Sequence, residues 1–351
     1  MSEIEQIIVE TTTRLFADQA TPAVLNAAEQ GGWPQALWHA VAELGLPLAL
    51  VPEADGGHGL EPEAALAVVR VAARFAVPLP LAETLWANRL LAAAGLPLAE
   101  GPASFAVSPE GDLPRATRAA AGWHLEGSLA RVPWGGQVDV VVALATHDEA
   151  PMLVRLPRGA FTVTPGDNLA GEPRDDIAFS CDLPADACAP APAAAARLLE
   201  AGAALRTVQM AGALEKVLEL SVRYAGERVQ FGRPIGRFQA VQQNLAMLAG
   251  QAAVADGAAG LAINALAGTL DVLPIAIGKA RAGEAASIAC AITHQVHGAI
   301  GFTHEHELHR FTRRLWSWRD EFGADVLWNT RVGAAVAAAG ADGLWPLITA
   351  A

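Results

Sequence analysis

The first hundred residues carry apolar side chains at steps of three and four positions. Residues 4–19, 32–45 and 61–76 each show this spacing, which is typical of helices with one buried face. Between the second and third stretches, the segment VPEADGGHG concentrates proline and glycine, which favour a turn over a helix. The pattern therefore predicts an α-helical first domain over residues 1–103.

The pattern changes over residues 104–192. Short runs rich in β-branched residues, such as VDVVVALA and FTVTP, are separated by Gly, Pro and Asp. These features indicate short strands joined by turns. The segment predicts a small central β domain with antiparallel strands, followed by the Pro- and Ala-rich stretch CAPAPAAAARLLEAG.

Helical spacing returns over residues 193–351. One apolar stripe follows residues 204–222 and a second follows residues 238–252. Two long helices joined by a short loop pack antiparallel, and a further helix pair over residues 273–345 would complete a four-helix bundle. The predicted fold class is α+β, with N-terminal helices, a central β domain and a C-terminal four-helix bundle.

Composition limits the kinds of partner. The chain has 351 residues, 52% of them apolar, and a formal net charge of −13. An acidic balance argues against a nucleic-acid partner, which requires a basic surface. The N-terminus carries acidic charge where a secretory signal carries basic charge, and no apolar run is long enough to cross a membrane. We expect a cytoplasmic protein with no membrane span.

Candidate metal ligands do not follow a zinc pattern. The cysteines Cys181, Cys188 and Cys290 have no paired spacing and are interpreted as reduced thiols. Histidines gather between residues 294 and 309, but they lack a second matching pair on one helix face. We expect no metal site.

The stretch ERVQFGRPIGRFQAVQQ, residues 227–243, separates the two long helical stretches. Gly232 and Pro234 are expected to end the first helix, which puts Arg228, Gln230 and Phe231 on its last turn. A guanidinium suits a diphosphate, a carboxamide suits a ribose or base edge, and a phenyl ring packs on an aromatic ring. These residues could hold the ADP half of a dinucleotide. In the alternative interpretation, Arg228 complements the helix dipole, and Phe231 and Phe238 belong to the core.

The same stretch resembles a signature of the acyl-CoA dehydrogenase family of flavoproteins. HQVHGAIGFTHEHELHR, residues 294–310, resembles the second signature of that family. Residues 33–59 and 122–145 resemble its N-terminal and β-domain segments. The resemblance implies helix, β, helix architecture and the cofactor FAD. It also implies an oligomer, because the ADP contacts of this family cross a subunit interface.

The resemblance also implies site residues and a reaction. Arg228, Gln230, Phe231 and Gln239 would contact the ADP portion of FAD, and Gln295 with Gly298 would complete the cofactor site. The implied reaction is α,β-desaturation of an acyl-CoA substrate, in which a carboxylate takes the α proton and the flavin accepts a hydride. The electrons would pass to an acceptor that the sequence does not identify.

The catalytic carboxylate departs from the family pattern. Where the family usually has Glu before Gly, this chain has Phe322 before Gly323, with Glu321 one residue earlier. Some members carry the Glu on the helix that leads to the first signature, and that position is Gly202 here, two residues from Glu200. Glu321 is the candidate base.

Three interpretations of the function stay open. The first is a self-sufficient homo-oligomer that uses Glu321. The second is a non-catalytic subunit of a heteromeric acyl-CoA dehydrogenase, such as those that act on steroid side-chain CoA thioesters, which lends its ADP contacts to a complete partner. The weak flavin-ring motifs VSPEGDLPRAT and ARVPWGG favour a partner. The third is a related flavoprotein with a small substrate that is not a CoA thioester.

Overall fold

The computed structural model describes residues 3–108, 112–268 and 270–349. The chain forms two compact units, the first from Met1–Ala65 and Pro78–Leu198 and the second from Leu66–Val77 and Leu199–Ala351. The segment Leu66–Val77, which the sequence assigned to the first domain, therefore groups with the C-terminal helices. The three domains and their bounds derived from the sequence stay a prediction.

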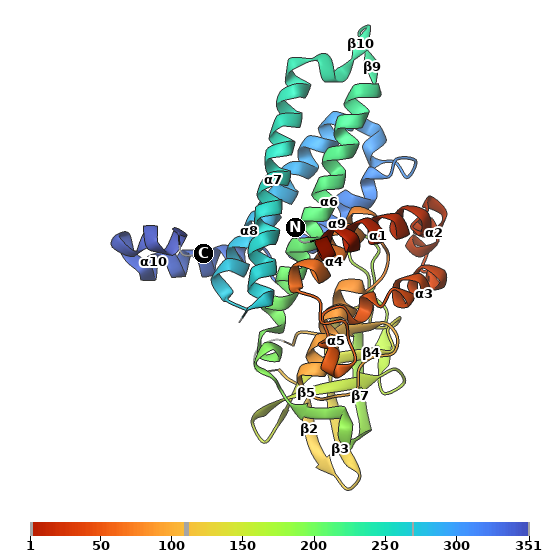
Figure 1. Ribbon diagram of the computed structural model, residues 1–351, viewed down its shortest axis with the longest axis vertical. Helices are drawn as coiled ribbons and strands as arrows, with labels where there is room; N and C mark the ends of the chain where they lie inside the picture. Colours follow the sequence, from red (N-terminus) through yellow and green to blue (C-terminus); the bar gives the residue numbers. More distant parts are fainter. Residues whose placement is uncertain (1–2, 109–111, 269, 350–351) are drawn as a thin grey trace. The chain divides into compact units, whose positions relative to one another are not determined.

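The N-terminal part is helical, as predicted (Figure 1). Its α-helices are α1 (Glu3–Gln19), α2 (Pro22–Glu29), α3 (Gln35–Glu43), α4 (Pro62–Arg74) and α5 (Leu81–Ala93). The Thr21 hydroxyl accepts a hydrogen bond from the Val24 amide at 3.4 Å, which caps α2. The predicted turn between α3 and α4 contains Gly56 at a φ of 87°, a left-handed conformation that glycine adopts without strain.

A single sheet of eight strands forms within the described residues of the central segment. The strands are β1 (Ala103–Phe105), β2 (Arg115–Ala119), β3 (Gly122–Pro133), β4 (Val140–His147), β5 (Ala150–Pro157), β6 (Thr162–Thr164), β7 (Arg174–Pro184) and β8 (Cys188–Pro190). Their order is β6-β7-β3-β2-β4-β5-β8, and β1 pairs with β4. The expectation of an antiparallel domain was wrong in one respect, because β1 runs parallel to β4 and β2 meets β4 in parallel at Arg115 and Thr146.

The sheet is covered where its strands are most apolar. Val140, Val141 and Val142 of β4 are all buried, so both faces of this strand are shielded from water. The helix α5 packs on β1 and β4 and covers one face, and its residues Leu81, Leu85 and Leu90 are almost fully buried. On the opposite face Val141 lies in the core cluster of the sheet. A helix on one face and the sheet core on the other thus account for a strand that is apolar on both faces.

The C-terminal helices are α6 (Leu198–Glu227), α7 (Gln239–Ala267), α8 (Val272–His297), α9 (Leu308–Asp320) and α10 (Asp325–Thr349). Residues 273–345 therefore form three helices, not the single pair that the sequence predicted. The helix α8 packs against α7, α9 and α10. A side chain at Gly278 of α8 would place its Cβ 2.9 Å from the Ala258 carbonyl of α7, so glycine permits the close approach of these helices.

A short hairpin connects α6 to α7 (Figure 1). The helix α6 ends at Glu227, and the strands β9 (Val229–Gln230) and β10 (Arg233–Pro234) pair beyond it. Gln230 and Phe231 therefore lie in the hairpin, not on the last helical turn as predicted. Phe231 and Gly232 have φ values of 52° and 82°, which make the tight reversal.

The helix α7 is, among the described residues, the one helix long and apolar enough to cross a membrane by length and composition. A helix in a soluble bundle passes the same test. Since α7 packs along α8, we interpret it as a bundle helix.

Candidate cofactor site and base region

A pocket of about 340 Å³ lies between the α6–α7 hairpin, the start of α7 and the end of α8. Gln230 and Phe231 line it from the hairpin, Asn244 from α7 and Gln295 from α8. Three of the six predicted cofactor-site residues thus meet in one pocket, although Gln295 is far from the other two in the sequence. Asn244 is an additional lining residue that the sequence patterns did not reveal.

Phe231 is presented to solvent. Its side chain is 92% exposed, so the alternative interpretation that placed it in the core was wrong. The ring lies edge-on to Phe238 at 6.1 Å between centroids, and the Arg233 guanidinium lies 4.3 Å from the Phe238 ring centroid. The open face of Phe231 could stack on a planar ring, and Arg233 adds positive charge beside it.

The other three predicted cofactor-site residues are exposed but do not line this pocket. Arg228 follows the end of α6, where its carbonyl accepts the Ile235 amide at 2.8 Å and closes the hairpin. Gln239 begins α7, and Gly298 ends α8 with a φ of 64°. The backbone of these three residues is held by the adjoining helices and hairpin. The side chains of Arg228 and Gln239 face solvent, and so does the backbone of Gly298.

This arrangement fits the ADP half of FAD. The described pocket lining has neutral carboxamides and aromatic or aliphatic side chains, which suit an adenosine group with its ring and its hydroxyls. The guanidinium of Arg228 lies outside this lining, where it would suit the negatively charged diphosphate.

Neutral histidines lie behind the pocket at the end of α8. The His297 ring stacks on Tyr224 at 4.5 Å, and burial lowers the His297 pKa to about 4. The His294 ring stacks between Phe302 at 3.9 Å and Trp316 at 5.6 Å, and burial also lowers its pKa. Aromatic packing thus accounts for these two histidines, and the absence of a metal site stays a prediction.

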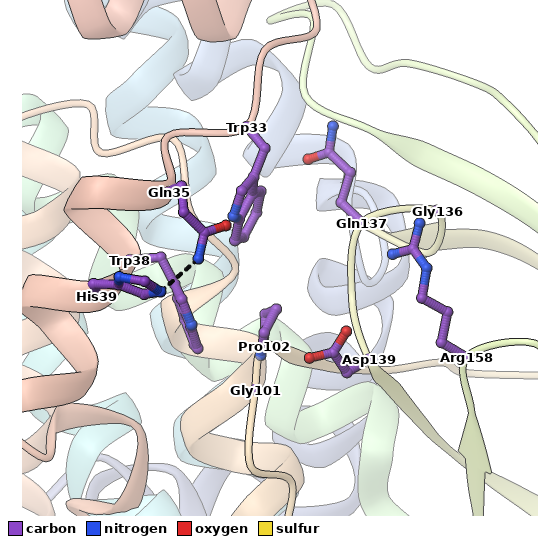
Figure 2. Close-up of a pocket in the computed structure, with 10 residues that line it drawn as sticks. All are labelled: Trp33, Gln35, Trp38, His39, Gly101, Pro102, Gly136, Gln137, Asp139 and Arg158. Carbon is purple, nitrogen blue, oxygen red and sulfur yellow. Dashed lines mark hydrogen bonds between the residues drawn. The ribbon is translucent and has the colours of Figure 1, made fainter.

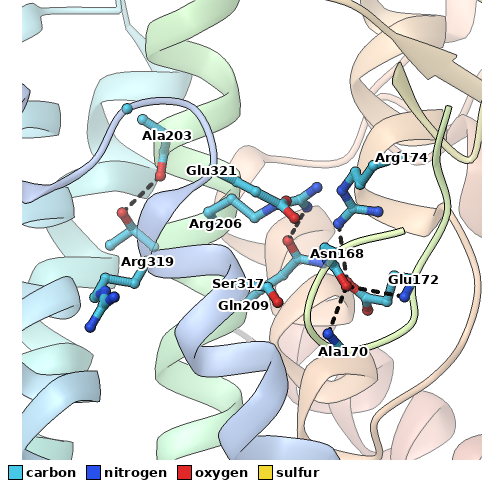
Figure 3. Close-up of polar contacts among 12 residues, drawn as sticks. Asn168, Ala170, Glu172, Arg174, Ala203, Arg206, Gln209, Ser317, Arg319 and Glu321 are labelled. Carbon is cyan, nitrogen blue, oxygen red and sulfur yellow. Dashed lines mark hydrogen bonds and ion pairs between the residues drawn. The ribbon is translucent and has the colours of Figure 1, made fainter. Parts of the chain in front are cut away.

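The candidate base Glu321 follows the end of α9 and is engaged by an arginine. The Arg206 Nε of α6 donates to Glu321 Oε2 at 2.7 Å, and the side-chain exposures are 2% and 8% (Figure 3). Arg206 Nη1 also donates to Gln209 Oε1 at 2.5 Å. A buried ion pair of this kind holds the carboxylate in place.

The two positions where the family carries its base are in direct contact with each other. A Cβ on Gly202 would lie 2.2 Å from Cδ1 of Phe322, so the phenyl ring occupies the space that a side chain at residue 202 would need. Neither glycine nor phenylalanine can accept a proton. The second sequence candidate, Glu200, is 2.7 Å from Arg331 in a further ion pair.

A buried lysine and a tryptophan hold the turn that carries Glu321. Lys279 is fully buried and donates through Nζ to the carbonyls of Arg319 at 2.5 Å and Gly323 at 3.0 Å. The indole of Trp328 donates to the carbonyls of Phe322 and Gly323, both at 3.1 Å. Burial lowers the Lys279 pKa to about 8. The turn is therefore rigid, which fixes both the Glu321 ion pair and the Phe322 ring.

Known proteins match both helical parts of the sequence. Residues 193–325 match the C-terminal domain of acyl-CoA dehydrogenases, and residues 2–97 match their N-terminal domain. Acyl-CoA dehydrogenase IpdE2 of Mycobacterium tuberculosis is 32% identical over 329 residues, which cover 89% of this chain and 91% of IpdE2. The chain belongs to the acyl-CoA dehydrogenase family. Acyl-CoA dehydrogenase FadE34 of the same organism is 32% identical over 307 residues, which cover 84% of this chain and 41% of FadE34.

Solved structures of acyl-CoA dehydrogenases share the fold. The ChsE4-ChsE5 complex from Mycobacterium tuberculosis matches with a TM-score of 0.82 and 22% identity, over 96% of this chain and 98% of that chain. The Tcur3481-Tcur3483 steroid ACAD matches with a TM-score of 0.84 and 24% identity, over the same shares of the two chains. Butyryl-CoA dehydrogenase of Megasphaera elsdenii has a TM-score of 0.82 and 21% identity, with 96% of this chain and 98% of that chain covered. The predicted α+β class is confirmed.

The two segments interpreted as weak flavin-ring motifs are only partly described by the structure. Part of VSPEGDLPRAT falls on residues 109–111, outside the described residues. In ARVPWGG, Trp134 is 6% exposed, and its backbone φ is 59°. The Trp134 side chain is thus part of the sheet core.

Proposed function

We propose that this chain is a subunit of a heteromeric acyl-CoA dehydrogenase, that it completes the FAD site, and that a partner subunit supplies the base. The observation that carries the proposal is the contact between Gly202 and Phe322, the two positions where the family base would stand. The nearby carboxylates Glu321 and Glu200 are both ion-paired with arginines. In each pair a carboxylate oxygen already accepts a hydrogen bond from the guanidinium, so the carboxylate would have to give up this contact before it could take a proton from a substrate.

In this proposal the chain's exposed hairpin meets the cofactor. Arg228 would bind the diphosphate, Gln230 and Gln295 would hydrogen-bond the adenosine, and Phe231 would stack on its ring. Gln239 and the open backbone of Gly298 would complete the contact. When bound, FAD supplies the hydride acceptor for α,β-desaturation of an acyl-CoA thioester.

The relatives support both the assembly and the substrate class. One structural neighbour is a complex of two named chains, and another is a steroid ACAD with two named chains. We therefore propose a heteromer of two related chains that acts on a bulky, steroid-derived CoA thioester. It would work in the cytoplasm, and it would pass its electrons to an acceptor of unknown identity.

The rival function is a self-sufficient homo-oligomer in which Glu321 takes the α proton. Glu321 is the carboxylate adjacent to the expected position, so this function stays a candidate. It would require Glu321 to exchange its contact with Arg206 for one with substrate.

The visible absorbance spectrum and native mass of the protein expressed alone distinguish the two functions. The heteromer predicts little or no bound flavin until a partner chain of the family is added. One FAD per chain in a homo-oligomer that acyl-CoA reduces would overturn it. In that case Glu321→Gln should abolish flavin reduction. The matched control Glu200→Gln also removes an ion-paired carboxylate, but it should leave flavin reduction intact.

Arg228→Ala tests the cofactor contact in the assembled protein. We expect FAD affinity to fall by about tenfold or more, because a charge-assisted contact with the diphosphate is lost. Arg237→Ala removes an exposed charge from the same connection and serves as the control. Unchanged flavin occupancy in Arg228→Ala would exclude the diphosphate role.

A further inference from the structure

A second pocket lies entirely within the first compact unit (Figure 2). Its volume is about 500 Å³, and it is lined from the start of α3, the segment before β1, the β3–β4 loop and the end of β5. None of the residues assigned above to FAD or to the base lines it. Two tryptophans, one acidic side chain and one basic side chain line the pocket. Each of these three types of side chain would bind a different part of a ligand.

Asp139 is the acidic group, and its position is well defined. Its backbone amide donates to the Pro102 carbonyl at 2.8 Å, and its carbonyl accepts the Arg158 amide at 2.8 Å. A Cβ on Gly101 would lie 1.9 Å from Asp139 Oδ2, so the carboxylate rests directly against the bare glycine backbone. Among the described residues, no side chain forms an ion pair with this carboxylate. Figure 2 shows it directed toward the open space of the pocket.

Arg158 is the basic group on the same lining. Its Nη1 donates only weakly, at 3.5 Å, to the Val138 carbonyl, and the described residues include no carboxylate paired with it. In Figure 2 the guanidinium lies beside Gly136. Asp139 and Arg158 thus line the same pocket with opposite charges, but they do not form an ion pair with each other. Their remaining hydrogen-bonding capacity is open to a ligand.

Trp33 and Trp38 form the aromatic wall opposite these charges. Their ring centroids are 6.1 Å apart at an interplanar angle of 47°. Trp38 is 5% exposed, and it packs in the core. Trp33 is half-buried, and in Figure 2 its ring borders the open space. The face of an indole attracts an ammonium group, most strongly where water is partly excluded.

The amide of Gln35 is oriented as well. Its Nε2 lies 2.7 Å from Nε2 of His39, and it can donate to this ring nitrogen. That contact leaves the Gln35 carbonyl oxygen free to accept a hydrogen bond in the pocket. The aromatic side of the pocket therefore offers an acceptor and π faces, which both favour a cationic donor.

We infer that this pocket binds a small zwitterion, with its ammonium group between Asp139 and Trp33 and its carboxylate group on Arg158. A simple cation would meet the repulsion of Arg158, and a simple anion would meet that of Asp139. A zwitterion satisfies both charges at once. The volume of the pocket leaves room for an aliphatic chain between the two groups.

Isothermal titration calorimetry at low ionic strength tests this inference on the full chain. The probes are 5-aminovalerate and glycine betaine as zwitterions, choline as a cation and valerate as an anion. We expect at least one zwitterion to bind at least about tenfold more tightly than either singly charged probe. Failure of both zwitterions to bind would overturn the inference, and so would equal binding of choline or valerate.

Variants locate the binding. Asp139→Asn and Arg158→Gln should each lower zwitterion affinity by about tenfold, because each removes one charge contact. Gly101→Ala should also weaken binding, since its methyl group displaces the Asp139 carboxylate without any change in charge. The matched controls Asp148→Asn and Arg14→Gln alter exposed charges elsewhere and should leave affinity unchanged. Affinity that is equal in the pocket variants and the wild type would place the ligand elsewhere and overturn the inference.

Discussion

Glu321 and Phe322 are adjacent in the sequence, but their side chains have different surroundings. Glu321 meets Arg206, and the Phe322 ring fills the space beside Gly202. Lys279 and Trp328 hold the turn between them through carbonyl groups. At the scale of single residues, an ion pair therefore holds the Glu321 carboxylate, and the Phe322 ring fills the position where the family base is expected.

His297 predicts how stability depends on pH. Burial lowers its pKa from 6.5 to about 4, so the folded protein binds fewer protons than the unfolded chain between these pH values. The free energy of unfolding should therefore fall as pH decreases from 6.5 towards 4, with a contribution of up to about 3 kcal/mol from this residue. Burial lowers the pKa of His294 and His306 too, which adds to the same trend.

Urea unfolding at several pH values measures this effect. His297→Gln should flatten the decrease between pH 6.5 and pH 4. The exposed residue His304 provides the control variant His304→Gln, which should keep the wild-type slope. A slope that is equal in wild type and His297→Gln would contradict the prediction.

At the scale of elements, the α6–α7 hairpin and the turn after α9 carry most of the candidate chemistry. The hairpin brings Gln230 and Phe231 to a pocket that Gln295 of α8 also lines. The turn after α9 lies against α6 at Gly202. In both cases a short irregular segment presents side chains that a continuous helix would point elsewhere.

The contact between α6 and the turn predicts strong coupling between two substitutions. Gly202→Ala should lower the free energy of unfolding by about 1–3 kcal/mol, because its methyl group would overlap the Phe322 ring. Phe322→Ala also destabilises the fold, since it removes a packed ring. In the double variant the alanine methyl fits the space that the ring has left, so the two losses should not add. Additive losses in a double-mutant cycle measured by urea unfolding would show that the two residues are not in contact.

At the scale of the whole molecule, apolar side chains remain exposed on α7 and α10. Met247 of α7 is 52% exposed, and Val326 and Trp345 of α10 are 78% and 72% exposed. Exposed apolar surface of this kind is typical of subunit interfaces. It agrees with the oligomer that the family resemblance implied.

The exposed face of α7 predicts a variant that separates assembly from folding. Met247→Glu places a charge in the expected interface, so native mass spectrometry should show a shift from oligomer to monomer. The melting temperature of monomeric Met247→Glu should stay within a few degrees of that of the wild-type protein diluted until it is monomeric. The reason is that residue 247 faces solvent in the monomer. The control is Glu227→Gln, because Glu227 is exposed. Gln251→Glu is a less suitable control, because the side-chain oxygen of Gln251 is buried. An unchanged oligomer in Met247→Glu would exclude this part of α7 from the interface.

The sequence alone was sufficient to predict the α+β class and the order of helices, sheet and helices along the chain. Apolar spacing predicted α1, α3, α4 and the two long helices, because a helix repeats its buried face every three to four residues. Signature segments along the chain indicated the family, which the comparisons confirm. The residues predicted to contact ADP came from the same signatures, and their role stays a prediction.

Contacts between residues distant in the sequence became visible only in the folded chain. Spacing cannot reveal that Arg206 pairs with Glu321, that Phe322 fills the space at Gly202, or that β1 runs parallel to β4. The pocket between Trp33 and Asp139 likewise joins a helix start to a loop that lies about a hundred residues further on. Local patterns report the conformation of neighbouring residues, whereas ion pairs, ring contacts and pockets form between elements that folding brings together.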